Sequence, residues 1–297
     1  MEVTGVRRTR LYRCIQDLYV DGYPIAVICS FLKINRSSYY KWIHRRKSVQ
    51  ESENETLLHE ISVIYEEHSG TYGYRRIADE YNATHDKAYN LKRFYRLTRL
   101  LGLRSVIRRK RPSYRRSSPE VTAANILNRS FTTDSVNEKW CTDVTEMKYG
   151  PEGRKAYLSA ILDLKSRDIV SFVIGKSNNN KLVFDTFDLA VQKYPDAKPV
   201  FHSDRGFQYT SRQFRAKLEQ QQMKQSMSRV GRCIDNGPME GFWGILKCEM
   251  YYLNRFETYE ELVKAVGRFI HYYNTQRRQH KLNCLPPAVF RSLLESA

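Results

Sequence analysis

The feature that most constrains the fold of this chain is a change of hydrophobic period near residue 130. Before it, apolar residues recur at helical spacing in segment after segment, beginning with LYRCIQDLYVDGY. After it come three runs rich in β-branched and aromatic residues, over residues 137–149, 154–166 and 167–177. We therefore expect an all-α N-terminal region followed by a domain built on a sheet.

The C-terminal part then alternates between the two periods. Short polar turns at residues 151–153 and 166–168 join the three strands into an antiparallel meander. A helix, a short strand, a helix capped by Thr210 or Ser211, another strand and two long helices are expected to follow. The order βββ-α-β-α-β-α-α is that of an α/β ribonuclease-H-like domain, a mixed five-stranded sheet with flanking helices, here expected over residues 131–297.

The first fifty residues show three helical segments. The third, NRSSYYKWIHRRK, follows the second after the short connection KIN, which suits a helix-turn-helix over residues 1–50. On this third helix Arg36, Ser37, Tyr40 and Lys41 are candidate contacts to a DNA groove or to phosphates. A small structural bundle is the alternative interpretation.

Residues 51–103 form a second predicted helical module, rich in Arg and Tyr. Its segment YGYRRIADEYN carries Tyr72, Tyr74, Arg75 and Arg76, which are able to hydrogen-bond phosphates. Aromatic residues at helical spacing also occur in ordinary helix cores, and that alternative stays open here.

A basic linker is predicted over residues 104–130. Its segment RSVIRRKRPSYRR holds seven Lys or Arg among thirteen residues, and Pro112 opposes continuation of a helix. Because like charges at this density repel one another, we expect Arg108, Arg109, Lys110 and Arg111 to follow a DNA backbone. A merely solvated loop is the alternative.

The net charge of the whole chain, +18, favours a polyanionic partner, and we expect double-stranded DNA. No apolar run approaches the ~20 residues of a membrane-spanning helix, and the N-terminus lacks the apolar segment of a signal peptide. The six Cys form no CxxC pair, so neither a zinc site nor a disulfide framework is indicated. These patterns predict a cytoplasmic protein without membrane attachment.

Two aspartates are placed by the predicted strands. Asp143 lies in the middle of the first strand, where a carboxylate costs free energy unless it faces a cleft or a cation. Asp204 ends the fourth strand in HSDRG, where an ordinary turn is the alternative. Because the first and fourth strands are neighbours in a ribonuclease-H-like sheet, we expect these two carboxylates to lie together.

A third carboxylate, Glu240, lies near the start of a predicted helix. It borders the apolar stripe formed by Met239, Phe242, Trp243, Leu246 and Met250, so packing this stripe on the sheet directs Glu240 towards the two aspartates. Lys247 lies two turns along on the same side, either as a DNA contact or as a surface lysine. Asp163, Asp168 and Asp235 are further acidic candidates, but turns and caps explain them better.

Three carboxylates suit phosphodiester chemistry. Two Mg²⁺ ions roughly 3.5 to 4 Å apart activate the attacking oxygen and stabilise the leaving one, and Mg²⁺ prefers oxygen ligands. We therefore expect Asp143, Asp204 and Glu240 to be both catalytic residues and metal ligands, with Mn²⁺ able to replace Mg²⁺.

The motifs WxxDVT at 140–145, HSDRGxQY at 202–209, DNGPMExFWxxLK at 235–247 and YNxxRxxHxxL at 273–282 together resemble one family. It is the OrfB protein of the bacterial insertion-sequence transposases of the IS-three group, in the retroviral-integrase superfamily. YGYRRI at 72–77 is similar to its N-terminal helical module. The family often has Ser-Phe-Phe where this chain has Gly241, Phe242 and Trp243.

This resemblance implies a DDE transposase that cuts at inverted terminal repeats and joins the freed 3′-hydroxyl to target DNA. It makes Asp143, Asp204 and Glu240 the DDE triad and Lys247 a DNA contact. It also implies a homo-oligomer on DNA, association with the bacterial nucleoid, and either an OrfA partner or an OrfA fusion. A catalytically inactive DNA-binding regulator and a ribonuclease-H-like nuclease are the alternatives.

Overall fold

The computed structural model describes residues 2–46, 48–107, 125–128, 130–229 and 233–296. Contacts divide the chain into two units, residues 1–60 and residues 61–297. The boundary lies inside one helix, α4 (Val49–Glu67). The boundaries predicted at residues 50, 103 and 130 remain predictions, and most of the basic linker lies outside the described residues.

The first unit contains the three predicted helices, α1 (Glu2–Val20), α2 (Ile25–Phe31) and α3 (Arg36–Ile43). Pro24 caps the start of α2, where its missing N–H costs no hydrogen bond. A small core of Ile15, Ile28, Cys29 and Tyr39 joins the three helices. The helical character of this region is confirmed.

The second unit begins with the rest of α4, followed by α5 (Tyr74–Thr84) and α6 (Leu91–Leu100). Helix α4 ends at a turn in which Ser69 and Gly70 both have positive φ. Glycine adopts such a conformation without strain, which allows the chain to leave the helix here.

The centre of the second unit is a five-stranded sheet in the order β3-β2-β1-β4-β5. Strands β1 (Lys139–Tyr149), β2 (Arg154–Asp163) and β3 (Ile169–Gly175) form the antiparallel meander. The short strands β4 (Val200–Ser203) and β5 (Lys224–Met227) extend it in parallel on the other side of β1. This mixed topology confirms the ribonuclease-H-like α/β fold.

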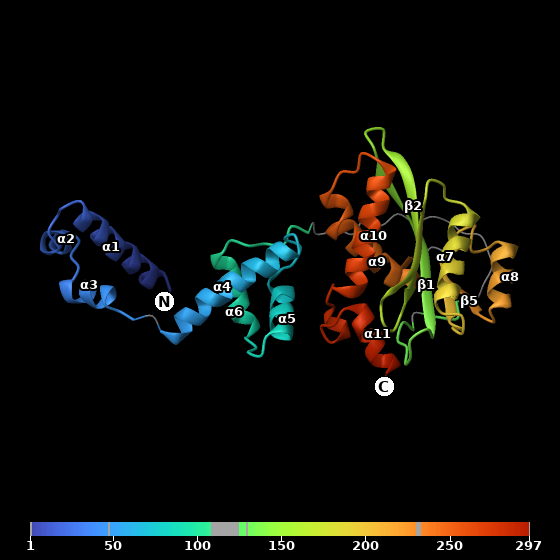
Figure 1. Ribbon diagram of the computed structural model, residues 1–297, viewed down its shortest axis with the longest axis horizontal. Helices are drawn as coiled ribbons and strands as arrows, with labels where there is room; N and C mark the ends of the chain where they lie inside the picture. Colours follow the sequence, from blue (N-terminus) through green and yellow to red (C-terminus); the bar gives the residue numbers. More distant parts are fainter. Residues whose placement is uncertain (1, 47, 108–124, 129, 230–232, 297) are drawn as a thin grey trace. The chain divides into compact units, whose positions relative to one another are not determined.

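Helices cover both faces of the sheet (Figure 1). On one face α7 (Asn180–Lys193) and α8 (Arg212–Gln220) pack over Trp140, Ile161 and Phe201. On the other, α9 (Gly237–Glu249) and α10 (Tyr259–Thr275) pack over Cys141, Met147 and Leu158. Since side chains alternate along a strand, the odd-numbered residues of β1, Asp143 among them, belong to the face covered by α9.

The C-terminal end holds one helix that we did not expect, α11 (Pro287–Glu295), next to the short 3₁₀ segment His280–Leu282. The predicted cap of α8 is Ser211, whose hydroxyl accepts the N–H of Phe214 at 3.2 Å. In the part of the chain that the structure describes, no helix is both long and apolar enough to cross a bilayer. The side chains of five of the six cysteines are described, and all five are free thiols.

Candidate active site

Asp143 and Asp204 come together because β1 and β4 pair in parallel. The ladder matches Trp140 with Phe201 and Cys141 with His202. Continuing that register by two residues sets Asp143 opposite Asp204, just beyond the end of β4. The two aspartates that the sequence placed in one site are thus brought side by side by strand pairing.

Both oxygens of Asp143 accept hydrogen bonds. Oδ1 accepts the backbone N–H of Val144 at 2.8 Å, and Oδ2 accepts the indole N–H of Trp243 at 3.0 Å. Burial, followed by the negative charge of Asp204, raises the pKa of Asp143 to about 7 in spite of these two donors. The charge of Glu240 adds to this rise, so both other carboxylates act electrostatically on Asp143.

Asp204 lies in a tight turn after β4. Its Oδ1 accepts the N–H of Gly206 at 2.9 Å, and burial raises its pKa above the ordinary value against that bond. A Cβ on Gly206 would stand 3.1 Å from Asp204 Oδ1 and 3.0 Å from Gln208 Oε1. Gly206 therefore provides the space in which the Asp204 carboxylate sits.

Tyr209 belongs to the core between the sheet and helices α7 and α8, close behind Asp143. It is fully buried, and its hydroxyl lies 3.1 Å from Oγ1 of Thr142, the residue before Asp143. Burial and the charge of Asp143 raise the pKa of Tyr209 well above its ordinary value, so the phenol stays protonated. The tyrosine of HSDRGxQY is thus a structural support for the site.

Glu240 lies in the first turn of α9 and is exposed. The helix is tied to β1 on both sides of it: Asn236 Nδ2 donates to the carbonyl of Thr142 at 3.0 Å, and Trp243 donates to Asp143. These ties orient the start of α9 towards the aspartates. Among the described residues, no three His, Cys, Asp or Glu side chains form a group set to hold a metal ion.

The predicted DNA contacts of the first unit lie on α3. Arg36, Tyr40 and Lys41 are exposed there, while Tyr39 is buried in the small core. Asn35 caps this helix by accepting the N–H of Ser37 at 3.0 Å. Exposed polar residues on one short helix agree with a DNA contact surface, which remains a prediction.

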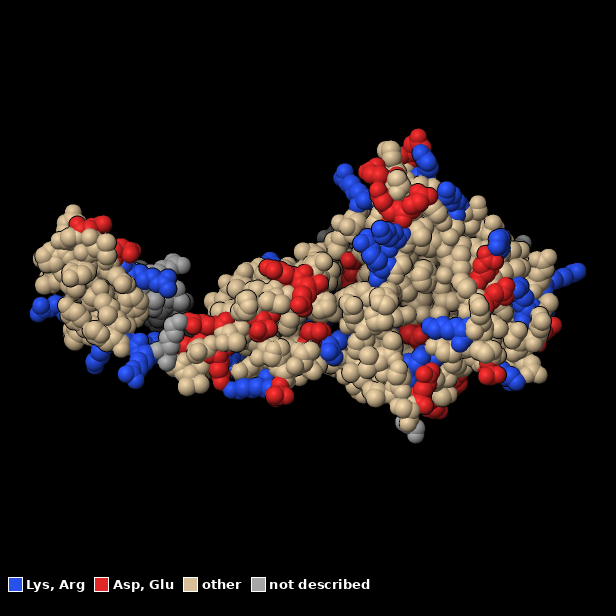
Figure 2. Space-filling model, viewed as in Figure 1, with Lys and Arg blue, Asp and Glu red and all other residues tan. Residues whose placement is uncertain are grey.

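Lys247 lies in the last turn of α9, two turns after Glu240, and is partly buried. On the face of the molecule shown in Figure 2, Lys and Arg are interspersed with Asp and Glu instead of forming one continuous basic surface. Arg108, Arg109, Lys110 and Arg111 lie outside the described residues. Contact of these five residues with DNA stays a prediction.

Arg75 and Arg76 differ in their surroundings. Arg75 is exposed, whereas Arg76 stacks on Tyr72 at 3.7 Å and donates to Glu249 of α9 at 3.0 Å. Arg277 also donates to Glu249, at 2.7 and 2.8 Å. Burial alone would raise the pKa of Glu249. The two arginines outweigh burial and hold this pKa below its ordinary value. The sequence did not indicate this role of Arg76 in joining α5 to the core.

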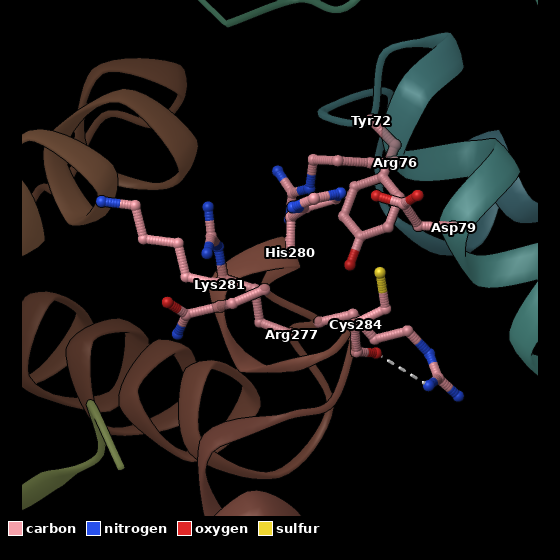
Figure 3. Close-up of a pocket in the computed structure, with 9 residues that line it drawn as sticks. Tyr72, Arg76, Asp79, Arg277, His280, Lys281 and Cys284 are labelled. Carbon is pink, nitrogen blue, oxygen red and sulfur yellow. Dashed lines mark hydrogen bonds between the residues drawn. The ribbon is translucent and has the colours of Figure 1, made fainter. Parts of the chain in front are cut away.

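Arg76 and Arg277 line a cavity of about 260 Å³, together with Tyr72, His280 and Lys281 (Figure 3). Arg277 and His280 belong to the motif YNxxRxxHxxL, so this motif contributes to the cavity wall.

The first two residues of the same motif have structural contacts. Tyr273 packs edge-on against Phe242 of α9, and Asn274 exchanges two hydrogen bonds with the backbone of Ile169 in β3. The motif therefore fastens α10 to the sheet and to α9.

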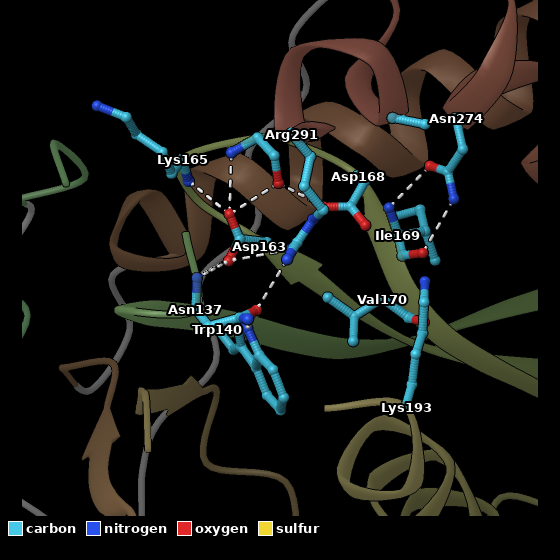
Figure 4. A network of polar contacts seen from close by, with 12 residues as sticks. Asn137, Trp140, Asp163, Lys165, Asp168, Ile169, Val170, Lys193, Asn274 and Arg291 are labelled. Atoms are coloured by element: carbon cyan, nitrogen blue, oxygen red, sulfur yellow. Dashed lines mark hydrogen bonds and ion pairs between the residues drawn. The ribbon is translucent and has the colours of Figure 1, made fainter. Parts of the chain in front are cut away.

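The other acidic candidates have structural partners. Asp163 accepts the N–H groups of Asn137 and Ser166, and Arg291 of α11 donates to Asp168 at 2.9 Å (Figure 4). Asp235 is fully buried and pairs with Arg229 and Asn125. The interpretation as a turn residue agrees with the structure for Asp163, whereas Asp168 and Asp235 form ion pairs with Arg291 and Arg229.

Two residues of the site were not expected from the sequence, Asn236 and Trp243. Trp243 was assigned to the apolar stripe, and it is indeed 6% exposed, but its N–H reaches Asp143. A tryptophan needs a partner for its N–H when it is buried. The sequence signal for this contact was the position of Trp243, one helical turn after Glu240 and so on the same side of the helix.

Comparison with known proteins adds family evidence. Residues 133–233 and 221–287 match two models described as integrase core domains, and residues 52–111 match an HTH-like domain. The putative transposase InsK for insertion sequence element IS150 of Escherichia coli is 37% identical over 271 residues, 91% of this chain and 94% of that protein. The IS904 transposase of Lactococcus lactis is 35% identical, covering 84% and 98%.

A protein of insertion element IS600 from Shigella sonnei is 34% identical over 89% of this chain and 97% of its own length. Among solved structures, the HTLV-2 integrase catalytic core domain in complex with magnesium is 20% identical, with a TM-score of 0.43 over 53% of this chain and 97% of that one.

Proposed function

Because the chain belongs to the IS-three group of insertion-sequence transposases, of the OrfB type, we propose that Asp143, Asp204 and Glu240 carry its chemistry. The chain is a DDE polynucleotidyl transferase that acts in DNA transposition. The observation that carries the assignment is the parallel pairing of β1 with β4, whose register sets Asp143 opposite Asp204. Burial and the charges of Asp204 and Glu240 all raise the pKa of Asp143. Like charges are gathered at functional sites at a cost that an ordinary turn does not require.

The donor atoms of these three residues are of the type that a hard divalent cation binds. All their donors are carboxylate oxygens, which Mg²⁺ and Mn²⁺ prefer, and the charges of Asp204 and Glu240 leave Asp143 with uncompensated repulsion that a cation would relieve. We assign Asp143, Asp204 and Glu240 as the ligands of two Mg²⁺ ions. When bound, the ions would activate the attacking oxygen and stabilise the leaving oxygen.

The remaining residues of the site orient and shield the carboxylates. Val144 and Trp243 fix the orientation of Asp143, and the N–H of Gly206 fixes that of Asp204. Tyr209 is buried in the core on the other face of the sheet, so substrate approaches from the side on which Glu240 is exposed. Lys247, on the same helix as Glu240, contacts a phosphate of the bound strand.

Recognition of the DNA ends is assigned to the helical regions. The exposed residues of α3 and Arg75 of α5 contact the inverted terminal repeats, and the basic linker follows the phosphate backbone. Cutting at two element ends requires two active sites, so we propose a homo-oligomer on DNA, with OrfA as a partner or as a fused segment. No specific observation favours an inactive regulator or a nuclease.

The test is a strand-transfer assay with the purified chain and a labelled duplex that carries the terminal repeat found beside its own gene. Joined products should appear with Mg²⁺ or Mn²⁺, disappear with EDTA, and require the repeat over a scrambled duplex of equal length. Hydrolysis without any joined product would support the nuclease alternative, and binding without either reaction would support the inactive regulator.

A further inference from the structure

Trp243 of α9 forms a hydrogen bond with a carboxylate of the candidate site. The indole Nε1–H donates to Oδ2 of Asp143 at 3.0 Å. The ring is almost fully buried and packs against Phe242, with ring centroids 5.1 Å apart. Phenylalanine would fill most of this space, but it has no donor for the carboxylate.

The two hydrogen bonds of Asp143 come from different elements. Val144 belongs to the same strand, whereas Trp243 belongs to α9, the helix that carries Glu240. Each carboxylate oxygen has two lone-pair sites, so each keeps one for a further partner after accepting one N–H. The donors therefore fix the direction in which the free lone pairs of Asp143 point.

The same helix is held to β1 a second time. Asn236 Nδ2 donates to the carbonyl of Thr142 at 3.0 Å, and Trp243 donates to the adjacent residue, Asp143. These two hydrogen bonds come from positions before and after Glu240. Losing the indole bond removes one of these two ties. It affects the orientation of Asp143 and the approach of Glu240 together.

Building on the proposed function, we propose that Trp243 is a positioning residue for the divalent-cation site, whose indole N–H orients Asp143 and holds the Glu240 turn of α9 against β1. Donors that orient a metal-ligating carboxylate typically contribute about 10–100-fold to metal affinity or activity. The effect is expected in binding of the cation, because the indole N–H is already used by the carboxylate of Asp143.

The matched variants are Trp243→Phe and Phe242→Leu in the full chain. Trp243→Phe keeps an aromatic ring and removes the donor, so the Mg²⁺ concentration for half-maximal joining, and the dissociation constant of Mg²⁺ measured by calorimetry, should both rise about tenfold or more. Phe242→Leu removes packing from the same stripe without touching Asp143. It should lower the melting temperature while leaving the Mg²⁺ requirement close to that of the parent.

A second readout follows Trp243 in the parent protein, where its hydrogen bond with Asp143 is intact. The chain has three tryptophans, Trp42, Trp140 and Trp243, and their indole N–H resonances can be assigned by replacing each in turn. During a Mg²⁺ titration the Trp243 resonance should shift, and the dissociation constant fitted to this shift should equal the calorimetric one. The shift should be absent in Asp143→Asn. The Trp42 resonance, from the first unit, should stay in place.

A Trp243 resonance that does not move while Mg²⁺ saturates the protein, or a Trp243→Phe metal requirement equal to that of the parent, would overturn the inference. Asp143→Asn separates this failure from a failure of the proposed function. If Asp143→Asn abolishes joining while Trp243→Phe changes nothing, only the role of Trp243 is lost. If Asp143→Asn still joins DNA, the catalytic assignment itself fails.

Discussion

Asp204 stands opposite Asp143 across the parallel pair of strands β1 and β4, and its charge is one cause of the pKa of about 7 at Asp143. Burial, and then the repulsion between these two carboxylates, favour the protonated form of Asp143 when no cation is bound. A cation that binds them must displace that proton, which makes its binding weaker as the pH falls.

The first prediction concerns Lys247, which lies two turns after Glu240 on α9. Lys247→Ala should weaken binding of terminal-repeat DNA and lower the slope of log K against log salt concentration by about one, because one phosphate contact is lost. Binding is measured by fluorescence anisotropy over a series of salt concentrations. Lys181→Ala is the control, since Lys181 lies on α7, on the other face of the sheet, and pairs with Asp185. An unchanged slope in Lys247→Ala would make Lys247 an ordinary surface lysine.

The second prediction concerns the buried charges that hold α11. Arg291 donates to Asp168 and lies 3.4 Å from Asp163, and all three side chains are buried. Arg291→Met should lower the free energy of unfolding by about 3–5 kcal/mol, because it leaves two buried carboxylates without their cation. Denaturant unfolding measures this. The control Ser292→Ala, on the exposed side of α11, should change it by less than about 0.5 kcal/mol, and a similarly small loss in Arg291→Met would contradict the account.

The third prediction is a pH dependence of stability that arises from His68. Its ring stacks on Tyr72 at 3.7 Å and lies 3.1 Å from the hydroxyl of Tyr272. Burial, and then the charge of Arg76, lower the pKa of His68 to about 4, whereas Glu249 acts in the opposite direction. Between pH 4 and about 6.5 the unfolded chain therefore binds more protons than the folded one.

It follows that His68 costs no stability above pH 6.5 and that stability is lost as the pH falls from 6.5 towards 4. The loss is on the order of 3 kcal/mol, at ~1.36 kcal/mol for each pKa unit. His68→Gln should flatten the curve of unfolding free energy in this window, while His59→Gln, at an exposed position on α4, should keep the slope of the parent. If the curves of unfolding free energy against pH run parallel for the parent and His68→Gln, folding does not oppose protonation of His68, and the prediction is wrong.

Much of the fold could be predicted because periodicity changes with element type. The meander, the alternating strands and helices, and the helical N-terminal region all follow from local patterns. Helix α11 was missed since it is short and follows Leu285 and Pro286, where proline normally marks the end of regular structure. Helix α1 begins at Glu2, although residues such as Val3, Thr4 and Gly5 have low helix propensity.

The residues of the candidate site were predictable in type but not in their partners. Three carboxylates on a strand, at a strand end and at a helix start indicated one site from chain order alone. The bond between Trp243 and Asp143 joins residues a hundred positions apart, and it depends on how α9 rotates over β1. The ion pair between Arg76 and Glu249 could not be predicted from the sequence either. No local pattern identifies the partner of an arginine in a helix rich in Tyr and Arg.

The central claim is that the three carboxylates act as one site, and it is tested most directly by strand transfer with Asp204→Asn beside Asp188→Asn. Asp188 lies on α7 and pairs with Lys217 on the other face of the sheet, so its replacement removes one negative charge away from the site. We predict that Asp204→Asn abolishes joining in Mg²⁺ while end-DNA affinity changes little, as Asp143→Asn and Glu240→Gln should also do, and that Asp188→Asn joins at the rate of the parent. Joining by Asp204→Asn at a rate comparable to the parent would contradict the account.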